Sequence, residues 1–332
     1  MLEYREDVPD PSPPPGEVLI RVGAAGLNNT DIWTREGAYG AESDPNAVRG
    51  WRREAMVFPR IQGADIAGRI VGVGEGVSVT RIGERVLVDN ALYTSEGEGL
   101  LEASIIGSER DGGFAELVAV PSANAHAIES QLTDAELASF PTAYVTAERM
   151  LNRARLRADE AVLVTGATGG VGTGLVQLAK LRSAYVIAVA GRGKEHLLQE
   201  LGADVVLPRD ADLADRVGET LVRRPLDVAA DVVGGEVVQT ILNLLRPGGR
   251  YVVAGAIAGP LVTVDLRTVY LKQLDLLGST MGNRDEFAAL VRHIESGRLR
   301  PMVWATYPLA ELDRAQRDFV QKGYVGKLVV VP

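Results

Sequence analysis

The hydrophobic pattern of the chain changes near Thr133. Before this position, short apolar runs are interrupted by glycine and proline, which is typical of strands joined by turns. Asn90–Glu109 lacks a regular pattern and is expected to be a loop. We therefore expect this region to be an irregular, mostly antiparallel, barrel-like domain. The expected strands are Val18–Gly26, Ile66–Gly74, Arg85–Asp89 and Phe114–Pro121.

From Glu160 onward, continuous apolar runs alternate with segments that carry apolar residues at helical spacing. Thr133 with Glu136, and Asn283 with Glu286, form capping-box patterns that each predict the start of a helix. Apolar strands connected by helices indicate a parallel sheet that is covered on both faces. The expected strands span residues 161–165, 185–190, 227–233, 250–256, 274–279 and 326–331, and the expected helices span 170–181, 194–202 and 309–320.

The 332 residues are enough for about two domains. Hydrophobic residues make up 46% of the chain and charged residues 24%, so a full core is expected rather than disorder. The formal net charge of -9 disfavours nucleic acids and anionic membranes as partners. No apolar run reaches the ~18 residues that a membrane-spanning helix needs, and no signal-peptide core is evident, so we expect a cytoplasmic location.

Cysteine is absent from the sequence, and the three histidines, His126, His196 and His293, are far apart. The chain therefore has no disulfide, no thiolate nucleophile and no cysteine ligand for zinc or an iron–sulfur cluster. No metal site is expected from this set of residues. The chemistry is expected to come from an organic cofactor.

The sequence AVLVTGATGGVGTGLVQLAKL predicts a strand, a glycine-rich turn and a helix. Small residues permit a tight turn and let the backbone approach a pyrophosphate, which the N–H groups at the helix N-terminus then face. The alternative is a purely structural turn, but the flanking elements and the later strand–helix units favour a dinucleotide site. The residues predicted to bind the cofactor here are Gly166, Ala167, Thr168, Gly169, Gly170, Val171 and Gly172.

The next expected strand ends at a basic loop, Gly191-Arg192-Gly193-Lys194. Enzymes that use NAD usually carry an acidic residue near this point, which binds the ribose 2′-hydroxyl group. Cations at a helix N-terminus are disfavoured by the macrodipole, and a 2′-phosphate would resolve this conflict through charge-assisted hydrogen bonds. We therefore predict NADPH as the cofactor, with an ordinary solvated loop as the alternative. The residues expected to bind it here are Ala190, Gly191, Arg192 and Lys194.

The motif GATGGVG, the earlier segment GADIAGRIVGVGEGV and the later segment LRPGGRYVVAG together resemble the medium-chain dehydrogenase/reductases, most of all their zinc-free quinone oxidoreductase-like branch. The resemblance implies an α/β fold, in which a Rossmann domain with a doubly wound parallel sheet is inserted in a GroES-like, β-rich catalytic domain. The expected domains are residues 1–143 with 279–332 for catalysis and residues 144–278 for NADP(H) binding. A substrate cleft between the domains and a homodimer are also implied.

The zinc ligands of related alcohol dehydrogenases have no counterpart in this chain. The segment in which those relatives carry their first cysteine ligand reads Asn28-Asn29-Thr30-Asp31. Their histidine ligand aligns with Ala64, and their third ligand falls at about Thr142. The resemblance therefore implies zinc-independent chemistry, and Asn28 with Asp31 matches an Asn-x-x-Asp pattern of quinone reductase relatives.

The resemblance also implies that one group of residues lies around a bound cofactor, near its nicotinamide. The alternative for these positions is ordinary packing at the ends of strands. The residues implied to lie near the nicotinamide are Thr142, Thr146, Ala254, Gly255, Ala256, Gly278, Ser279 and Thr280.

Relatives usually carry a strand before the segment that matches LEYREDVP, so we expect the N-terminal edge of the β-rich domain to differ from theirs.

Hydride transfer needs hydrogen-bond donors that stabilise negative charge on the substrate oxygen. Without zinc, Asn28 and Thr30 are the candidate donors, and Tyr39 is a candidate phenol donor of a proton. Asp31 completes the predicted catalytic set. The alternative role of Asp31 is to cap a turn, and that of Tyr39 is packing.

We therefore predict a cytoplasmic, NADPH-dependent oxidoreductase that acts on a small molecule, either a quinone or an α,β-unsaturated carbonyl compound. One alternative is a ketone, alcohol or enoyl-thioester reductase on the same scaffold. Another is a protein that binds NADPH without turnover. Neither nucleic acid nor a membrane is an expected partner.

Overall fold

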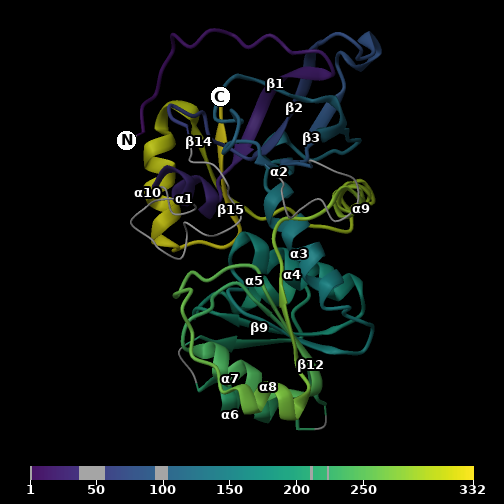
Figure 1. The fold of residues 1–332 in the computed structure, drawn as a ribbon, viewed down its shortest axis with the longest axis vertical. Helices are drawn as coiled ribbons and strands as arrows, with labels where there is room; N and C mark the ends of the chain where they lie inside the picture. Colours follow the sequence, from purple (N-terminus) through teal and green to yellow (C-terminus); the bar gives the residue numbers. More distant parts are fainter. Residues whose placement is uncertain (1, 37–56, 94–103, 210–211, 223) are drawn as a thin grey trace. The chain divides into compact units, whose positions relative to one another are not determined.

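The computed structural model describes residues 2–36, 57–93, 104–209, 212–222 and 224–332. The chain divides into two units, each built around its own β-sheet (Figure 1). Unit 2 is inserted in the chain of unit 1. Unit 1 comprises Met1–Thr142, Asn283–Gly297 and Pro301–Pro332, and unit 2 comprises Ala143–Gly282 and Arg298–Arg300.

Antiparallel pairing dominates unit 1. Among its described residues, seven strands form one sheet in the order β14-β15-β1-β2-β3-β7, and β6 pairs with β1. Val18, Ile20 and Val22 on β1 are buried, as expected for a strand with one face on a core. Ala25 on β1 pairs with Val330 on β15, which joins distant parts of the chain. The strands are β1 (Glu17–Gly26), β2 (Asp65–Val73), β3 (Arg85–Val88), β6 (Leu117–Pro121), β7 (Ala125–Ala127), β14 (Val303–Pro308) and β15 (Lys327–Val331).

Unit 1 also contains short helices. The predicted capping boxes are confirmed at Thr133 and Asn283, whose side chains accept hydrogen bonds from the backbone three residues later. The predicted loop at Asn90–Glu109 is partly wrong, because β4 (Ala91–Leu92) pairs with β5 (Ser104–Ile105). Strands of two residues are too short to leave an alternating pattern in the sequence. The helices are α1 (Asn29–Glu36), η1 (Val79–Arg81), η3 (Ser122–Asn124), α2 (Asp134–Leu137), α9 (Arg284–Glu295), η4 (Leu309–Glu311) and α10 (Leu312–Gln321).

A parallel sheet forms the centre of unit 2. In the described residues, six strands lie in the order β10-β9-β8-β11-β12-β13, and every neighbouring pair is parallel. Strands β8 and β11 are buried at every position, as expected when both faces of a sheet are covered. The strand order reverses between β8 and β11, which makes this the switch point of a doubly wound sheet. The strands are β8 (Ala161–Val164), β9 (Tyr185–Ala190), β10 (Val205–Pro208), β11 (Leu226–Asp231), β12 (Leu245–Val253) and β13 (Asp275–Gly278).

Helices cover both faces of this sheet. Figure 1 shows α4 and α5 on one face and α6, α7 and α8 on the other. The predicted α/β fold, a doubly wound sheet inserted in a β-rich domain, is thereby confirmed. The sequence did not predict β10, α6 or α8, because these short elements bury few apolar residues. The helices are α3 (Pro141–Arg153), α4 (Gly170–Leu181), α5 (Glu195–Glu200), α6 (Leu213–Thr220), α7 (Val237–Leu244) and α8 (Leu266–Lys272).

In the part of the chain that the structure describes, none of the helices has the length and apolar character needed to cross a bilayer.

Candidate functional site

The turn between β8 and α4 has a backbone that requires glycine at two positions. Gly166 has a φ of +56°, a conformation that residues with a Cβ rarely adopt. A Cβ on Gly172 would lie 2.2 Å from the carbonyl oxygen of Gly166. Gly169, which has no side chain that could cap the helix, is the N-cap of α4. The glycines of this turn therefore let backbone N–H donors approach a ligand closely, which fits the phosphates of a dinucleotide.

Further predicted cofactor residues follow β9, β12 and β13. Because all strands of the sheet are parallel, their carboxyl ends lie at the same edge as the glycine-rich turn. Backbone hydrogen bonds connect the segments at this edge. Ala167 N–H in the turn donates to Val189 O on β9 (3.2 Å), and Ser279 N–H after β13 donates to Val253 O on β12 (2.8 Å). The hydroxyl oxygen of Ser279 is buried and has no hydrogen-bond partner among the described residues. Such a group is a candidate contact for a bound cofactor.

Asp231, at the end of β11, lies at the same edge but has its hydrogen-bonding capacity filled. Its carboxylate accepts hydrogen bonds from the Thr165 hydroxyl, the Tyr251 phenol and the backbone N–H groups of Val233 and Gly234. A carboxylate with four donors is saturated. We therefore assign Asp231 a structural role, in which it fixes the loops that follow β8 and β11.

Three basic side chains follow the neighbouring strands β9 and β10. Arg192 and Lys194 come after β9, as predicted, and Arg209 comes after β10. The backbone N–H of Arg209 donates to Ala190 O (2.7 Å), and its guanidinium lies 4.0 Å from the position of a Cβ on Gly191. Burial and the charge of Arg209 lower the pKa of Lys194. Sequence reasoning missed Arg209, because only a predicted strand β10 would have placed it beside the end of β9.

Five buried polar residues of unit 1 form a second site, here called the buried polar cluster: Asn28, Asp65, Asn90, Thr142 and Lys327. Lys327 Nζ donates to Asp65 Oδ2 (2.8 Å) and to Asn28 Oδ1 (2.6 Å). On its other oxygen, Asp65 accepts from the Thr142 backbone N–H (2.8 Å) and the Thr142 hydroxyl. Asn90 Nδ2 donates to Thr142 Oγ1 (2.5 Å). The predicted residues Asn28 and Thr142 are thus connected through a buried ion pair.

Sequence reasoning did not propose Lys327 as a site residue. It opens the apolar strand β15, and 299 positions separate it from Asn28. Its only sign in the sequence is a lysine at the start of the run GKLVVV. The pairing of β15 with β1 is what brings the two residues together.

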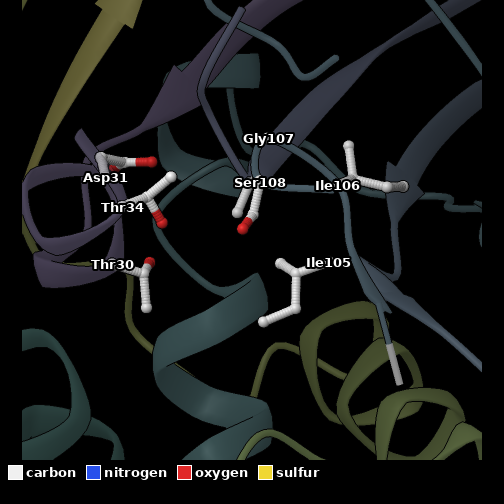
Figure 2. Close-up of a pocket in the computed structure, with 8 residues that line it drawn as sticks. Thr30, Asp31, Thr34, Ile105, Ile106, Gly107 and Ser108 are labelled. Atoms are coloured by element: carbon white, nitrogen blue, oxygen red, sulfur yellow. The ribbon is translucent and has the colours of Figure 1, made fainter. Parts of the chain in front are cut away.

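Asp31 and Thr30 line a small pocket of unit 1. Figure 2 shows Thr30, Asp31 and Thr34 of α1 on one side and residues 105–108 opposite them. The Asp31 carboxylate accepts a hydrogen bond from the Asn28 backbone N–H (2.7 Å), so it also performs the capping role considered as its alternative. Burial raises the pKa of Asp31 to about 7. A carboxyl group with this pKa can hold or release a proton near neutral pH.

The remaining predicted positions are less informative. Tyr39 lies outside the described residues. Thr146 is buried in α3, and Ala64 is buried beside β2. In the described ranges of the chain, no three histidine, aspartate or glutamate side chains are grouped as ligands for a metal ion.

Two family models match the chain. Residues 14–130 match the alcohol dehydrogenase GroES-like domain, and residues 170–296 match the zinc-binding dehydrogenase family. The quinone oxidoreductase of Mus musculus is 30% identical over 100% of this chain and 94% of its own length.

Solved structures show the same similarity. A protein of Sinorhizobium meliloti 1021, named provisionally as an alcohol dehydrogenase, is 56% identical with a TM-score of 0.95, over 99% of this chain and 92% of that one. The 2-octenoyl-CoA carboxylase reductase CinF, in complex with NADP and 2-octenoyl-CoA, is 28% identical with a TM-score of 0.82. That match covers 98% of this chain and 80% of the other.

Proposed function

The chain belongs to the medium-chain dehydrogenase/reductase superfamily, in its quinone oxidoreductase-like branch, and we propose that it is a zinc-independent oxidoreductase that uses NADPH. Its proposed substrate is a quinone or an α,β-unsaturated carbonyl compound. The observation that carries the proposal is the glycine-rich turn at the switch point of the parallel sheet, with three basic side chains after the neighbouring strands.

The preference for NADPH over NADH is supported by charge. Arg192, Lys194 and Arg209 supply three positive groups where enzymes that use NAD carry an acid. A 2′-phosphate would make charge-assisted hydrogen bonds with them. Burial and repulsion by Arg209 lower the pKa of Lys194, and a bound phosphate would stabilise its charged form.

A bound nicotinamide would supply a hydride, which carries two electrons to the substrate and leaves the cofactor oxidised. On an enone, hydride addition at the β-carbon would place negative charge on the carbonyl oxygen, and a proton added at the α-carbon would complete the reduction. Asn28 and Thr30 are the proposed donors that stabilise this charge. Asp31 follows Thr30 in α1, and its raised pKa lets it hold a proton near pH 7. Tyr39 stays a predicted member of the catalytic set.

The residues of this chain do not fit the zinc ion that the matched family name implies. The positions that hold its ligands in zinc-dependent relatives carry Asn28, Ala64 and Thr142, so neither thiolate nor imidazole is present. Lys327 places an ammonium group between Asn28 and Asp65, where it would repel a divalent cation. We therefore assign no step of the reaction to a metal.

We also propose a homodimer that forms through β13. This strand ends the parallel sheet of the described residues, and Leu276 on it is 47% exposed. Helix α8 exposes Leu266, Tyr270 and Leu271. An apolar sheet edge of this kind is normally covered, and a second copy would cover it symmetrically. Sedimentation of Leu276→Lys is expected to show monomers, whereas an unchanged dimer would place the interface elsewhere. The cytoplasmic location stays a prediction from the sequence.

The proposed reaction is tested with NADPH that carries deuterium at the transferred position. Wild-type protein is mixed with quinones, enones, ketones and an enoyl-CoA thioester. We expect oxidation of NADPH by a quinone or an enone, with one deuterium on the β-carbon of an enone product. Deuterium on the carbinol carbon of a reduced ketone, or activity with the CoA thioester alone, would favour the alternative reductases. NADPH binding without oxidation by any acceptor would favour the non-catalytic alternative.

Asn28→Ala tests the proposed donor. We expect kcat to fall about 100-fold, as when one donor to a developing oxyanion is removed, with NADPH affinity unchanged. Asn29→Ala is the matched control, because this neighbouring amide contacts Lys322 rather than the cluster. Equal activity of both variants would contradict the role of Asn28.

A further inference from the structure

Lys327 is a lysine enclosed in the sheet of unit 1, on a strand that lies between β14 and β1. Its side chain is 4% exposed, and that of its partner Asp65 is 0% exposed. A buried ammonium group is strongly unfavourable unless an anion and further acceptors surround it. Asp65 Oδ2 at 2.8 Å provides the anion, and Asn28 Oδ1 at 2.6 Å provides the second acceptor. Lys327 is therefore held by these two residues.

Hydrogen bonds to the second carboxylate oxygen of Asp65 fix the position of the ion pair. Asp65 Oδ1 accepts from the Thr142 backbone N–H (2.8 Å) and the Thr142 hydroxyl, and Asn90 Nδ2 lies 3.4 Å from the same oxygen. One carboxylate oxygen is thus engaged by Lys327 and the other by Thr142 and Asn90. Rotation of the carboxylate would break these hydrogen bonds, so the ammonium group of Lys327 has a defined place.

The fixed ammonium group decides which end of the Asn28 amide faces the cluster. With the ends exchanged, the amide N–H2 would face another donor, the ammonium of Lys327. With Oδ1 inward, Nδ2 makes a long hydrogen bond of 3.4 Å with Gly26 O. A cation on the amide oxygen also polarises the amide and strengthens its N–H donors. The Asn28 residue as a whole is 8% exposed.

We propose that Lys327 is a positioning residue of the reaction. Its ammonium group holds the Asn28 amide by the oxygen, so that the amide N–H2 donates to the substrate oxygen on which negative charge develops. This inference rests on the proposed reductase function. Lys327 thereby provides a fixed cation among positions that carry metal ligands in zinc-dependent relatives, and it acts on the substrate only through Asn28.

Two variants distinguish a role of Lys327 in the reaction from a role in the stability of the fold. Lys327→Met alone leaves the Asp65 carboxylate buried without its cation, so we expect the melting temperature to fall by about 10 °C. The paired change, Lys327→Met with Asp65→Asn, removes both charges and keeps an oxygen for the donors of Thr142. We expect it to recover most of the melting temperature.

Lys322→Met is the matched control. Lys322 lies on the same C-terminal segment, and its Nζ donates to Asn29 Oδ1 (2.9 Å), outside the buried polar cluster. It therefore reports what the loss of a nearby positive charge does without a change at Asn28. We expect its kcat to equal that of the wild type.

The readout is kcat for reduction of an enone with NADPH, together with NADPH affinity. We expect the paired change to lower kcat about 10-fold at unchanged NADPH affinity, because the amide of Asn28 is no longer oriented and polarised. In the Asn28→Ala background, the paired change should lower kcat by less than about twofold, because the group through which Lys327 acts is absent.

Full kcat in the paired variant would show that Lys327 and Asp65 serve the fold alone. An equal loss with and without the Asn28 side chain would show that Lys327 acts by another route. Either result overturns this inference and leaves the reductase function in place. A wild-type protein that reduces no acceptor contradicts the proposed function, and this inference with it.

Discussion

The glycine-rich turn of unit 2 and the buried polar cluster of unit 1 accommodate charge in opposite ways. The turn is suited to an anion because its glycines keep the backbone N–H groups accessible, and a Cβ on Gly172 would collide with a carbonyl oxygen at 2.2 Å. The cluster holds its own charges, because Lys327 and Asp65 neutralise each other and neighbouring side chains fill their hydrogen bonds. Added atoms should therefore disrupt the binding of an anion at the turn, whereas removal of atoms should destabilise the cluster.

The largest expected effect is that of Gly172→Val. The new Cβ meets the backbone of Gly166, which cannot move away without opening the turn. We expect NADPH affinity to fall by more than about 1000-fold, or about 4 kcal/mol, in a fluorescence titration. Gly218→Val on α6 is the control, because a Cβ there meets nothing within 4 Å. A Gly172→Val protein that binds NADPH as the wild type does would contradict the placement of the phosphates.

Asp31, whose carboxylate accepts a hydrogen bond from the Asn28 backbone N–H, should make the stability of the fold depend on pH. Its pKa is raised from 3.8 to about 7 by burial, so the folded state keeps a proton that the unfolded chain loses. This contribution to stability is full below about pH 4 and is lost as the pH rises to about 7, a change of up to about 4 kcal/mol. Asp31→Asn should remove it.

Urea unfolding at about pH 4 and about pH 8 measures this difference. The stability of Asp31→Asn relative to the wild type should increase towards pH 8. Burial also raises the pKa of Asp89 to about 7. Asp89 is present in both proteins, so its titration contributes equally to both stability curves. Parallel curves for the two proteins would show that Asp31 does not titrate in this range.

The smallest expected effect is that of Arg209→Ala, which extends the comparison to a side chain near the turn. Loss of one charge-assisted contact with the 2′-phosphate should weaken NADPH binding about 10-fold, or about 1.4 kcal/mol, and leave NADH binding unchanged. Arg216→Ala removes an exposed arginine of α6 and serves as the control. Equal losses of affinity for both nucleotides would assign Arg209 to something other than the 2′-phosphate.

The two regions also differ in how far the sequence predicts them. The turn consists of seven consecutive residues, Gly166–Gly172, and the strand and helix around it follow from local apolar patterns. The fold follows in the same way, since β8 and β9 are apolar runs. In the cluster, Asp65 and Thr142 are 77 positions apart, and Asn28 and Lys327 are 299 apart. Such contacts depend on strand pairing, which spacing within a sequence does not encode.

Arg209 shows that strand pairing also decides contacts between residues that are close in the sequence. It lies 15 positions after Lys194, yet only the pairing of β10 with β9 brings its guanidinium beside the loop. The four residues of β10 are mostly half-buried and carry no clear pattern of their own. The basic loop predicted after β9 therefore lacks one neighbouring arginine, and its role in binding the cofactor stays a prediction.

The preference for NADPH is tested most directly by an equilibrium titration of the wild-type protein with NADPH and, separately, with NADH. The turn and its three basic neighbours predict that NADPH binds at least about 10-fold more tightly than NADH. Equal or weaker binding of NADPH would contradict the assignment of the 2′-phosphate site. If neither nucleotide bound, the proposal that this chain is a nicotinamide-dependent oxidoreductase would be wrong.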